Sequence, residues 1–219
     1  MAKFDGALIA KPRTGVGSRG VRVLLDESAL TATLGDERLV IQPFLSDVSP
    51  YRAQQGVSNL GLPLFWAPAL TQYVAQTVIG QDGRVLGRFD MEATMVAGRY
   101  ERAHAVNDVD LRRIGDQYAA HLAQAGWRGP VNVQCVHHPK WGFHAIEFCA
   151  SATAGLMPRV LLGFDEIAVT LSAWTGKTFE RRPSLPVSRV ALRVTRDVGQ
   201  DDVARAALRT HGSWPVSGG

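Results

Sequence analysis

The residues best suited to chemistry lie near the start of the chain, where a lysine precedes a run of glycines. Lys11 directly follows the short apolar segment 8–10, and three glycines fall between positions 15 and 20. Glycine has no Cβ, so the backbone N–H groups of such a loop can converge on phosphate oxygens. A lysine ammonium can reach the same phosphate as a point charge. The segment therefore predicts a phosphate-binding loop formed by Lys11, Gly15, Gly17, Ser18, Arg19 and Gly20.

Two common phosphate-binding loops are excluded by the segment directly after these glycines. A Walker A loop has a Gly-Lys-Ser/Thr sequence leading into a helix, and the dinucleotide-binding fingerprint also leads into a helix. Here the alternating residues 21–25 predict a strand instead. From these residues alone, an ordinary glycine-rich hairpin without a ligand remains the alternative.

A second set of candidate residues lies in two segments, 131–136 and 143–149, that are predicted to be strands joined by a turn. Because side chains alternate along a strand, Glu147 and Cys149 share one face, and a paired strand can present Gln134 beside them. Carbonyl and carboxylate oxygens are the donors that Mg²⁺ prefers, whereas a thiol is a poor substitute. The pattern therefore offers two oxygen ligands, Gln134 and Glu147. The alternative is that Glu147 is an ordinary, partly exposed strand carboxylate.

Other reactive groups in the sequence do not form a recognisable site. The spacing of His137, His138 and His144 matches no common zinc pattern. Cys135 should point away from the face of Cys149, which disfavours both a zinc site and a disulfide. No Gly-x-Ser-x-Gly elbow is present, so a serine hydrolase has no local support. We expect the tryptophans to be packing residues and not a stacking platform: Trp66, Trp127, Trp141 and Trp174.

The elements that position these residues are strands and helices in a mixed order. Before residue 45 the order is strand, glycine loop, strand, helix and strand, with Asp26 as the helix N-cap and Gly35 at its end. Residues 46–71 are rich in proline and predict an irregular insertion. Further strands are expected at 72–79, 84–89, 131–136, 143–149 and 190–194, and helices from about 107 to 126, at 164–174 and at 201–210.

The composition limits the functions that the chain can have. Its 24 basic and 20 acidic residues leave a net charge of only +4, and the basic residues are mostly scattered. A nucleic-acid surface would show a basic stripe interleaved with aromatic residues, so we expect no nucleic acid, although the pI of about 9.4 keeps it as a weaker alternative. No apolar run is long enough to cross a membrane, and the start lacks the layout of a signal peptide. With only two cysteines, the protein is expected to be cytoplasmic.

The lysine-bearing strand and glycine loop resemble those of the ATP-grasp superfamily, and residues 40–45 resemble its hinge. The resemblance implies that the hinge, with Gln42, binds adenine. The Pro43 carbonyl would accept from the adenine amino group, and the Leu45 N–H would donate to the ring. Three later segments are similar to the carbamoyl-phosphate synthase large-subunit branch: residues 129–134, 146–149 and 162–166.

This resemblance implies an α+β, ATP-grasp-like fold with ATP and Mg²⁺ as cofactors. Residues 1–45 would form a small lid subdomain, 46–71 an insertion, and 72–219 a larger antiparallel sheet flanked by helices, with a C-terminal extension. Gln134 and Glu147 would hold the metal. Four departures imply that the metal site is weak or incomplete: Cys149 in place of asparagine, Ser151 in place of arginine, Gln72 in place of a carboxylate, and the acidic stretch 90–92 where basic residues are common.

The function implied is that of an ATP-dependent ligase, in which ATP phosphorylates a carboxylate and an amine or ammonia displaces the phosphate. ATP-grasp enzymes normally begin with a separate α/β domain, whereas this sequence begins close to the Lys11 strand. We therefore expect the ATP-binding component of a split ligase, active with a protein partner that supplies that domain. No catalytic residue can be assigned from the pattern. The alternative is a catalytically inactive relative that acts as a scaffold or regulatory partner.

Overall fold

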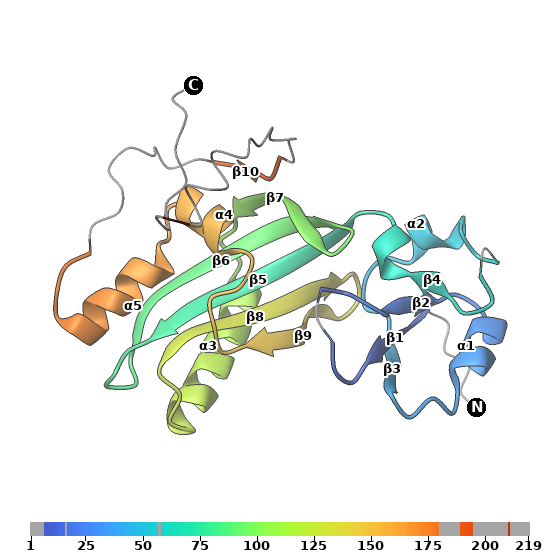
Figure 1. Ribbon diagram of the computed structural model, residues 1–219, viewed down its shortest axis with the longest axis horizontal. Coiled ribbons are helices and arrows are strands. Elements are labelled where there is room, and N and C mark those ends of the chain that lie inside the picture. The colour runs from blue at the N-terminus through green and yellow to red at the C-terminus, as the bar shows by residue number, and fades with distance from the viewer. Residues whose placement is uncertain (1–6, 16, 57, 180–188, 195–209, 211–219) are drawn as a thin grey trace.

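The computed structural model describes residues 7–15, 17–56, 58–179, 189–194 and 210. It contains a four-stranded and a six-stranded sheet, which lie next to one another along the longest axis of the molecule (Figure 1). All paired strands in both sheets are antiparallel. The predicted α+β class, with a small sheet and a larger antiparallel sheet flanked by helices, is therefore confirmed.

The small sheet has the strand order β3-β1-β2-β4 and comprises β1 Leu8–Pro12, β2 Arg22–Leu24, β3 Leu39–Pro43 and β4 Leu62–Pro63. Helix α1 (Glu27–Thr33) lies between β2 and β3. It begins at the predicted cap, where the Asp26 side chain accepts a hydrogen bond from the Ala29 N–H at 2.9 Å. The predicted order of strand, loop, strand, helix and strand is confirmed.

Most of residues 46–71 pack onto the small sheet, although we predicted an irregular insertion. They contain α2 (Ser49–Arg52), the 3₁₀ helix η1 (Leu64–Trp66) and β4, which pairs with β2. Tyr51 and Leu62 are buried in one cluster with Val23 and Phe44. A one-turn helix and a two-residue strand are too short to produce a hydrophobic period, so the sequence pattern could not indicate them.

The large sheet has the order β10-β7-β6-β5-β8-β9. Its strands are β5 Leu70–Ile79, β6 Val85–Val96, β7 Arg99–Ala105, β8 Gly129–His138, β9 Gly142–Cys149 and β10 Ala191–Leu192. Strand β6 extends well past its predicted end. Strand β7 was not predicted, because several charged side chains interrupt the alternation of apolar and polar residues in this segment. Of the helix predicted at 201–210, only the last residue lies within the described part of the chain.

Helices cover both faces of the large sheet (Figure 1). On one face, which we call the α3 face, α3 (Val109–Gln124) packs through Leu111 and Ala119 against Ala75 and Val133. The opposite face is covered in part by α4 (Leu156–Leu161) and α5 (Glu166–Thr175), and we call it the α5 face. Asp165 caps α5, so this helix begins slightly later than predicted.

Candidate nucleotide site

Lys11 connects the two sheets. Its Nζ atom donates to the backbone carbonyl of Ile146 in β9 at 3.5 Å. That carbonyl is accessible because the pairing of β8 with β9 slips: Gln134 lies opposite Glu147, whereas Cys135 lies opposite Ala145. Ile146 is therefore the extra residue of a β-bulge. The ammonium group of the small sheet thus contacts the backbone of β9 at the residue before Glu147.

The glycine loop also reaches the large sheet. Gly17, Ser18 and Gly20 all have positive φ angles, of 62°, 58° and 75°, so the backbone changes direction repeatedly in this segment. A Cβ atom added to Gly98, in the turn between β6 and β7, would lie 3.0 Å from the Gly17 carbonyl oxygen. Loop and turn therefore meet through their backbones. Such alternating conformations can form concave sites for anions, and the phosphate contacts of Gly15, Gly17, Ser18, Arg19 and Gly20 stay predictions.

The hinge lies on the outer edge of the small sheet. Phe44 donates its N–H to the Ala7 carbonyl at 2.9 Å, and backbone groups of an antiparallel strand alternate between its two edges. The Pro43 carbonyl and the Leu45 N–H therefore point away from β1. No strand of the described ranges pairs with this edge of β3. By the same alternation Gln42 directs its backbone towards β1, so its exposed side chain is what it offers to a ligand.

Polar side chains form a row on the α5 face of β5, β8 and β9. Gln134 lies directly opposite Glu147, so the structure brings the two predicted metal ligands together. Gln72 Nε2 donates to Gln134 Oε1 at 2.7 Å, and the Cys149 thiol donates to Glu147 Oε1 at 3.4 Å. Cys135 is buried on the α3 face, as predicted, and both cysteines are free.

The fit of this row to Mg²⁺ is partial. Gln134 and Glu147 are oxygen donors and suit the ion in kind, yet each already accepts a hydrogen bond from a neighbour. Among the residues that the structure describes, no group of three or more His, Cys, Asp or Glu could hold a metal ion. The two oxygen-donor side chains are therefore fewer than the ligands that Mg²⁺ requires, and the metal roles of Gln134 and Glu147 stay predictions.

The acidic stretch 90–92 does not bear on this row. Asp90 and Glu92 point to the α3 face, where Asp90 Oδ2 lies 3.6 Å from Arg112 Nε and Glu92 Oε1 lies 3.9 Å from His104 Nε2. Burial raises the pKa of Asp90, while Arg112 opposes this shift. Strand alternation therefore turns both side chains away from the row that contains Gln134 and Glu147.

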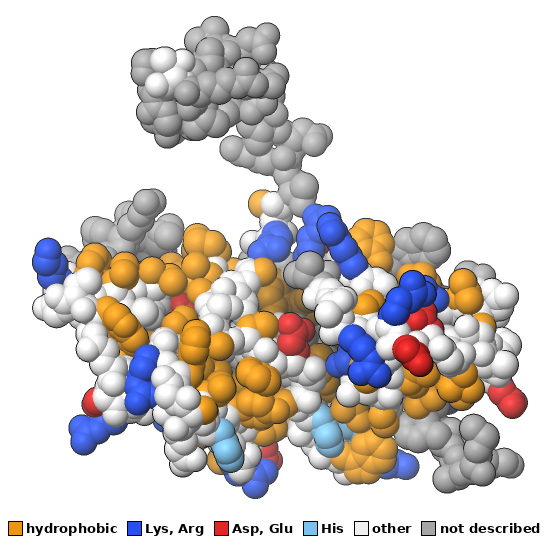
Figure 2. Space-filling model, turned by 60° about the horizontal axis from the view of Figure 1, so that its bottom comes forward, with side chains coloured by type: hydrophobic (Ala, Val, Ile, Leu, Met, Phe, Trp, Pro, Cys, Tyr) orange, Lys and Arg blue, Asp and Glu red, His pale blue; other side chains and the backbone are white. Residues whose placement is uncertain are grey.

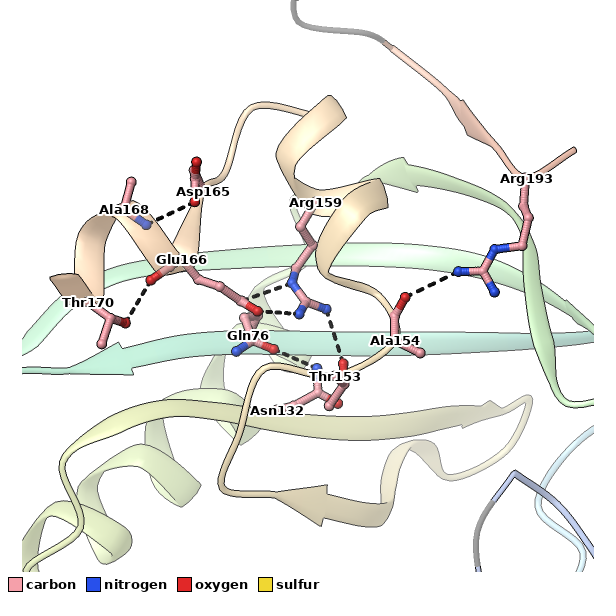
Figure 3. Close-up of polar contacts among 10 residues, drawn as sticks. All are labelled: Gln76, Asn132, Thr153, Ala154, Arg159, Asp165, Glu166, Ala168, Thr170 and Arg193. Carbon is pink, nitrogen blue, oxygen red and sulfur yellow. Dashed lines mark hydrogen bonds and ion pairs between the residues drawn. The ribbon is translucent and has the colours of Figure 1, made fainter. Parts of the chain in front are cut away.

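A buried ion pair lies close to the row and was not predicted (Figure 3). Arg159 of α4 donates to Glu166 of α5 through Nη2 at 2.6 Å and Nε at 3.0 Å, and both side chains are 0% exposed. A third donor, Arg159 Nη1, lies 3.4 Å from Thr153 Oγ1. The pair therefore ties both helices to the loop after β9, which contains Ser151. Two charged residues within a mainly apolar stretch were the available sequence signal.

Tyr100 is a further residue that the sequence did not single out. It comes from the unpredicted strand β7 and is only 5% exposed on the α5 face. Burial raises the pKa of Tyr100 to about 12; Arg159 opposes this shift, whereas Glu147 and Cys149 add to it. The hydroxyl group is therefore neutral and close to the polar row.

No protein-family profile and no curated protein matches the chain. An N5-carboxyaminoimidazole synthetase from Staphylococcus aureus, solved with ADP, aligns with a TM-score of 0.58 and 12% identity over 85% of this chain and 44% of its own. A biotin carboxylase from Campylobacter jejuni, solved as a β,γ-ATP complex, aligns with a TM-score of 0.54 and 16% identity over 84% and 40%. An L-amino acid ligase from Bacillus licheniformis gives 0.51 and 15% over 87% and 44%. The chain has the ATP-grasp fold.

Within the ATP-grasp fold, this chain spans about 40% of the length of the biotin carboxylase and 44% of the synthetase. The finer resemblance to the carbamoyl-phosphate synthase branch stays a prediction. No helix in the described residues is long and apolar enough to cross a membrane. On the face seen in Figure 2, Lys and Arg side chains are scattered among hydrophobic and acidic ones and form no continuous stripe.

Proposed function

We propose that this chain binds ATP at the junction between its two sheets, as the ATP-binding component of an ATP-dependent ligase. The observation that carries the proposal is the contact of Lys11 with the bulge of β9, because it brings the cation proposed to bind phosphate to the residue before Glu147, a proposed metal ligand. Complexes with ADP and with β,γ-ATP among the structural neighbours support it.

Different residues of the chain would bind the adenine base, the phosphates and the metal ion. The free Pro43 carbonyl and Leu45 N–H would read the adenine edge, with the Gln42 side chain beside them. Lys11 and the loop of Gly15, Gly17, Ser18, Arg19 and Gly20 would hold the phosphates. Gln134 and Glu147 would hold Mg²⁺, which when bound supplies positive charge against the phosphate oxygens.

The reaction proposed is activation of a carboxylate by ATP, followed by attack of an amine or ammonia. The part shared with each neighbour is under half of that neighbour's length, and the acceptor site would lie outside it. We propose that a protein partner contributes this part and that the complex works in the cytoplasm. Positioning of ATP against the acceptor would then be the main contribution of this chain.

Calorimetric titration of the purified chain with ADP and ATP, with and without Mg²⁺, tests the binding function. We expect saturable binding of one nucleotide per chain and an increase in the melting temperature. Absence of both heat and thermal shift under all four conditions would reject the proposal.

The isolated chain is expected to hydrolyse ATP negligibly. Ser151 supplies no cation to the phosphates, Cys149 supplies no oxygen to a metal, and no acceptor is held in place. Release of inorganic phosphate, measured with and without Mg²⁺, checks this. Robust turnover by the isolated chain would mean that a complete catalytic site exists within it.

Replacing Cys149 with asparagine is expected to strengthen Mg²⁺-dependent binding of ADP by about 2–10-fold. The substitution removes the thiol that donates to Glu147 and adds an oxygen donor beside it. Cys149→Ala is the matched control, since it removes the thiol without adding an oxygen, and it should leave the Mg²⁺ dependence unchanged. Both variants are compared by titrating Mg²⁺ at fixed ADP.

The second candidate function is that of a catalytically inactive ATP-grasp relative that acts as a scaffold or regulatory partner. The observation in its favour is that Gln134 and Glu147 are both engaged by neighbouring donors, Gln72 and Cys149. If Cys149→Asn and Cys149→Ala bind ADP equally well at every Mg²⁺ concentration, this second candidate is favoured.

A further inference from the structure

Two stacked rings stand at the turn between β8 and β9. The ring centroids of His138 and Trp141 are 4.0 Å apart and their planes differ by 14°. The turn holds them in place: the Lys140 N–H donates to His138 Nδ1 at 3.1 Å, and the Trp141 N–H donates to the His138 carbonyl at 3.2 Å. Trp141 is nevertheless 56% exposed, whereas we expected a packing residue. An exposed indole that stacks on a half-buried imidazole and is fixed by the backbone of its turn is suited to contact a flat ligand.

Strand order places this pair at the end of the large sheet where β5 begins. The two strands are antiparallel and their pairing ends at Tyr73 and Cys135, so the start of β5 at Leu70 and the end of β8 at His138 lie at the same end of the sheet. Leu70 packs against the core of the small sheet, which contains Phe44. Phe44 lies between the two hinge residues whose backbone groups are free. The β8–β9 turn also points towards the small sheet (Figure 1).

The hinge and the two rings can contact different parts of a purine base. The Pro43 carbonyl and the Leu45 N–H can read the edge of a purine through hydrogen bonds, but they make no contact with its face. An aromatic side chain stacks on that face, which is apolar and electron-rich. An adenine needs both kinds of contact to be bound in one orientation.

We propose that His138 and Trp141 form a stacking platform for the adenine base of the nucleotide bound at the junction. This inference rests on the proposed nucleotide-binding function and names residues that set its base specificity. Trp141 presents its exposed ring to the base, and His138 stacks behind it and keeps the indole in place.

Two ligands separate base recognition from phosphate recognition: ADP and inorganic tripolyphosphate. Trp141→Ala should lower ADP affinity by roughly 5–150-fold and leave tripolyphosphate binding unchanged, since stacking contributes only to the base. Trp141→Phe should restore most of the ADP affinity. Trp174→Ala, at an exposed tryptophan on α5, is the control and should change neither ligand. Quenching of tryptophan fluorescence by ADP should be lost in Trp141→Phe and kept in Trp174→Ala.

The outcomes are distinguishable because the wild type is titrated first. If it binds neither ADP nor ATP, the proposed function fails and the platform fails with it. If it binds ADP and Trp141→Ala binds it equally well, the platform alone is rejected. A Trp141→Ala variant that loses ADP and tripolyphosphate binding to the same extent, or melts at a lower temperature, also counts against it, because that would indicate a structural role or a contact with a protein partner.

Discussion

Replacing Arg159 with alanine is expected to lower the free energy of unfolding by about 3–5 kcal/mol. Arg159 and Glu166 are both fully buried, so the substitution leaves the Glu166 carboxylate without its partner in the interior. It also removes the contact with Thr153 and so loosens the loop after β9. Chemical unfolding of the wild type and the variant, compared at constant slope, measures the difference.

The ion pair of Arg113 with Asp110 supplies a matched control. Its two side chains are 68% and 61% exposed, and such surface pairs contribute about 0–1 kcal/mol. Arg113→Ala should therefore change the free energy of unfolding very little. Replacing both Arg159 and Glu166 with apolar residues of similar size should recover much of the loss, because no buried charge is then left unpaired. Equal costs for Arg159→Ala and Arg113→Ala would contradict the assignment of the buried pair as a major structural contact.

Replacing Lys11 with alanine is expected to weaken the binding of both ADP and tripolyphosphate by roughly 10–150-fold. This corresponds to about 1.5–3 kcal/mol, the range for one hydrogen bond to a charged group. In this structure the Lys11 ammonium donates to the neutral Ile146 carbonyl, and it can donate to a phosphate oxygen instead when a ligand binds. Calorimetry with both ligands gives the two affinities.

Lys177→Ala is the control for the lysine substitution, because Lys177 lies beyond the end of α5 and is exposed. Its loss removes the same charge at a distance from the junction and should change either affinity by less than about twofold. If Lys11→Ala binds both ligands with unchanged affinity, Lys11 does not contact the phosphates, and the proposed site loses its main support.

Local signals explain why the small sheet could be predicted from the sequence. The cap at Asp26, the glycine at position 35 and the alternation of residues 21–25 each act within a few residues. The shared face of Glu147 and Cys149 was predicted in the same way from the period of a strand. The structure contains these features close to where the pattern set them.

Contacts between segments that are distant along the chain could not be predicted from the sequence. The hydrogen bond from Gln72 to Gln134 joins residues 62 positions apart and depends on the register of β5 with β8. The bulge at Ile146 exists only in the pairing of two strands, so neither strand indicates it alone. The ring pair of His138 and Trp141 was missed for another reason: tryptophans are usually packed, and only the turn geometry keeps this one exposed.

The contact of Lys11 with Ile146 also bears on how strand β9 could pair with other molecules. Strand β9 is an outer strand of the large sheet, and such strands can recruit strands from other molecules and aggregate. Bulges and lysines are two means by which natural sheets discourage this, and β9 has a bulge that is met by a lysine from the other sheet. A change that draws the small sheet away therefore also uncovers an edge open to intermolecular pairing.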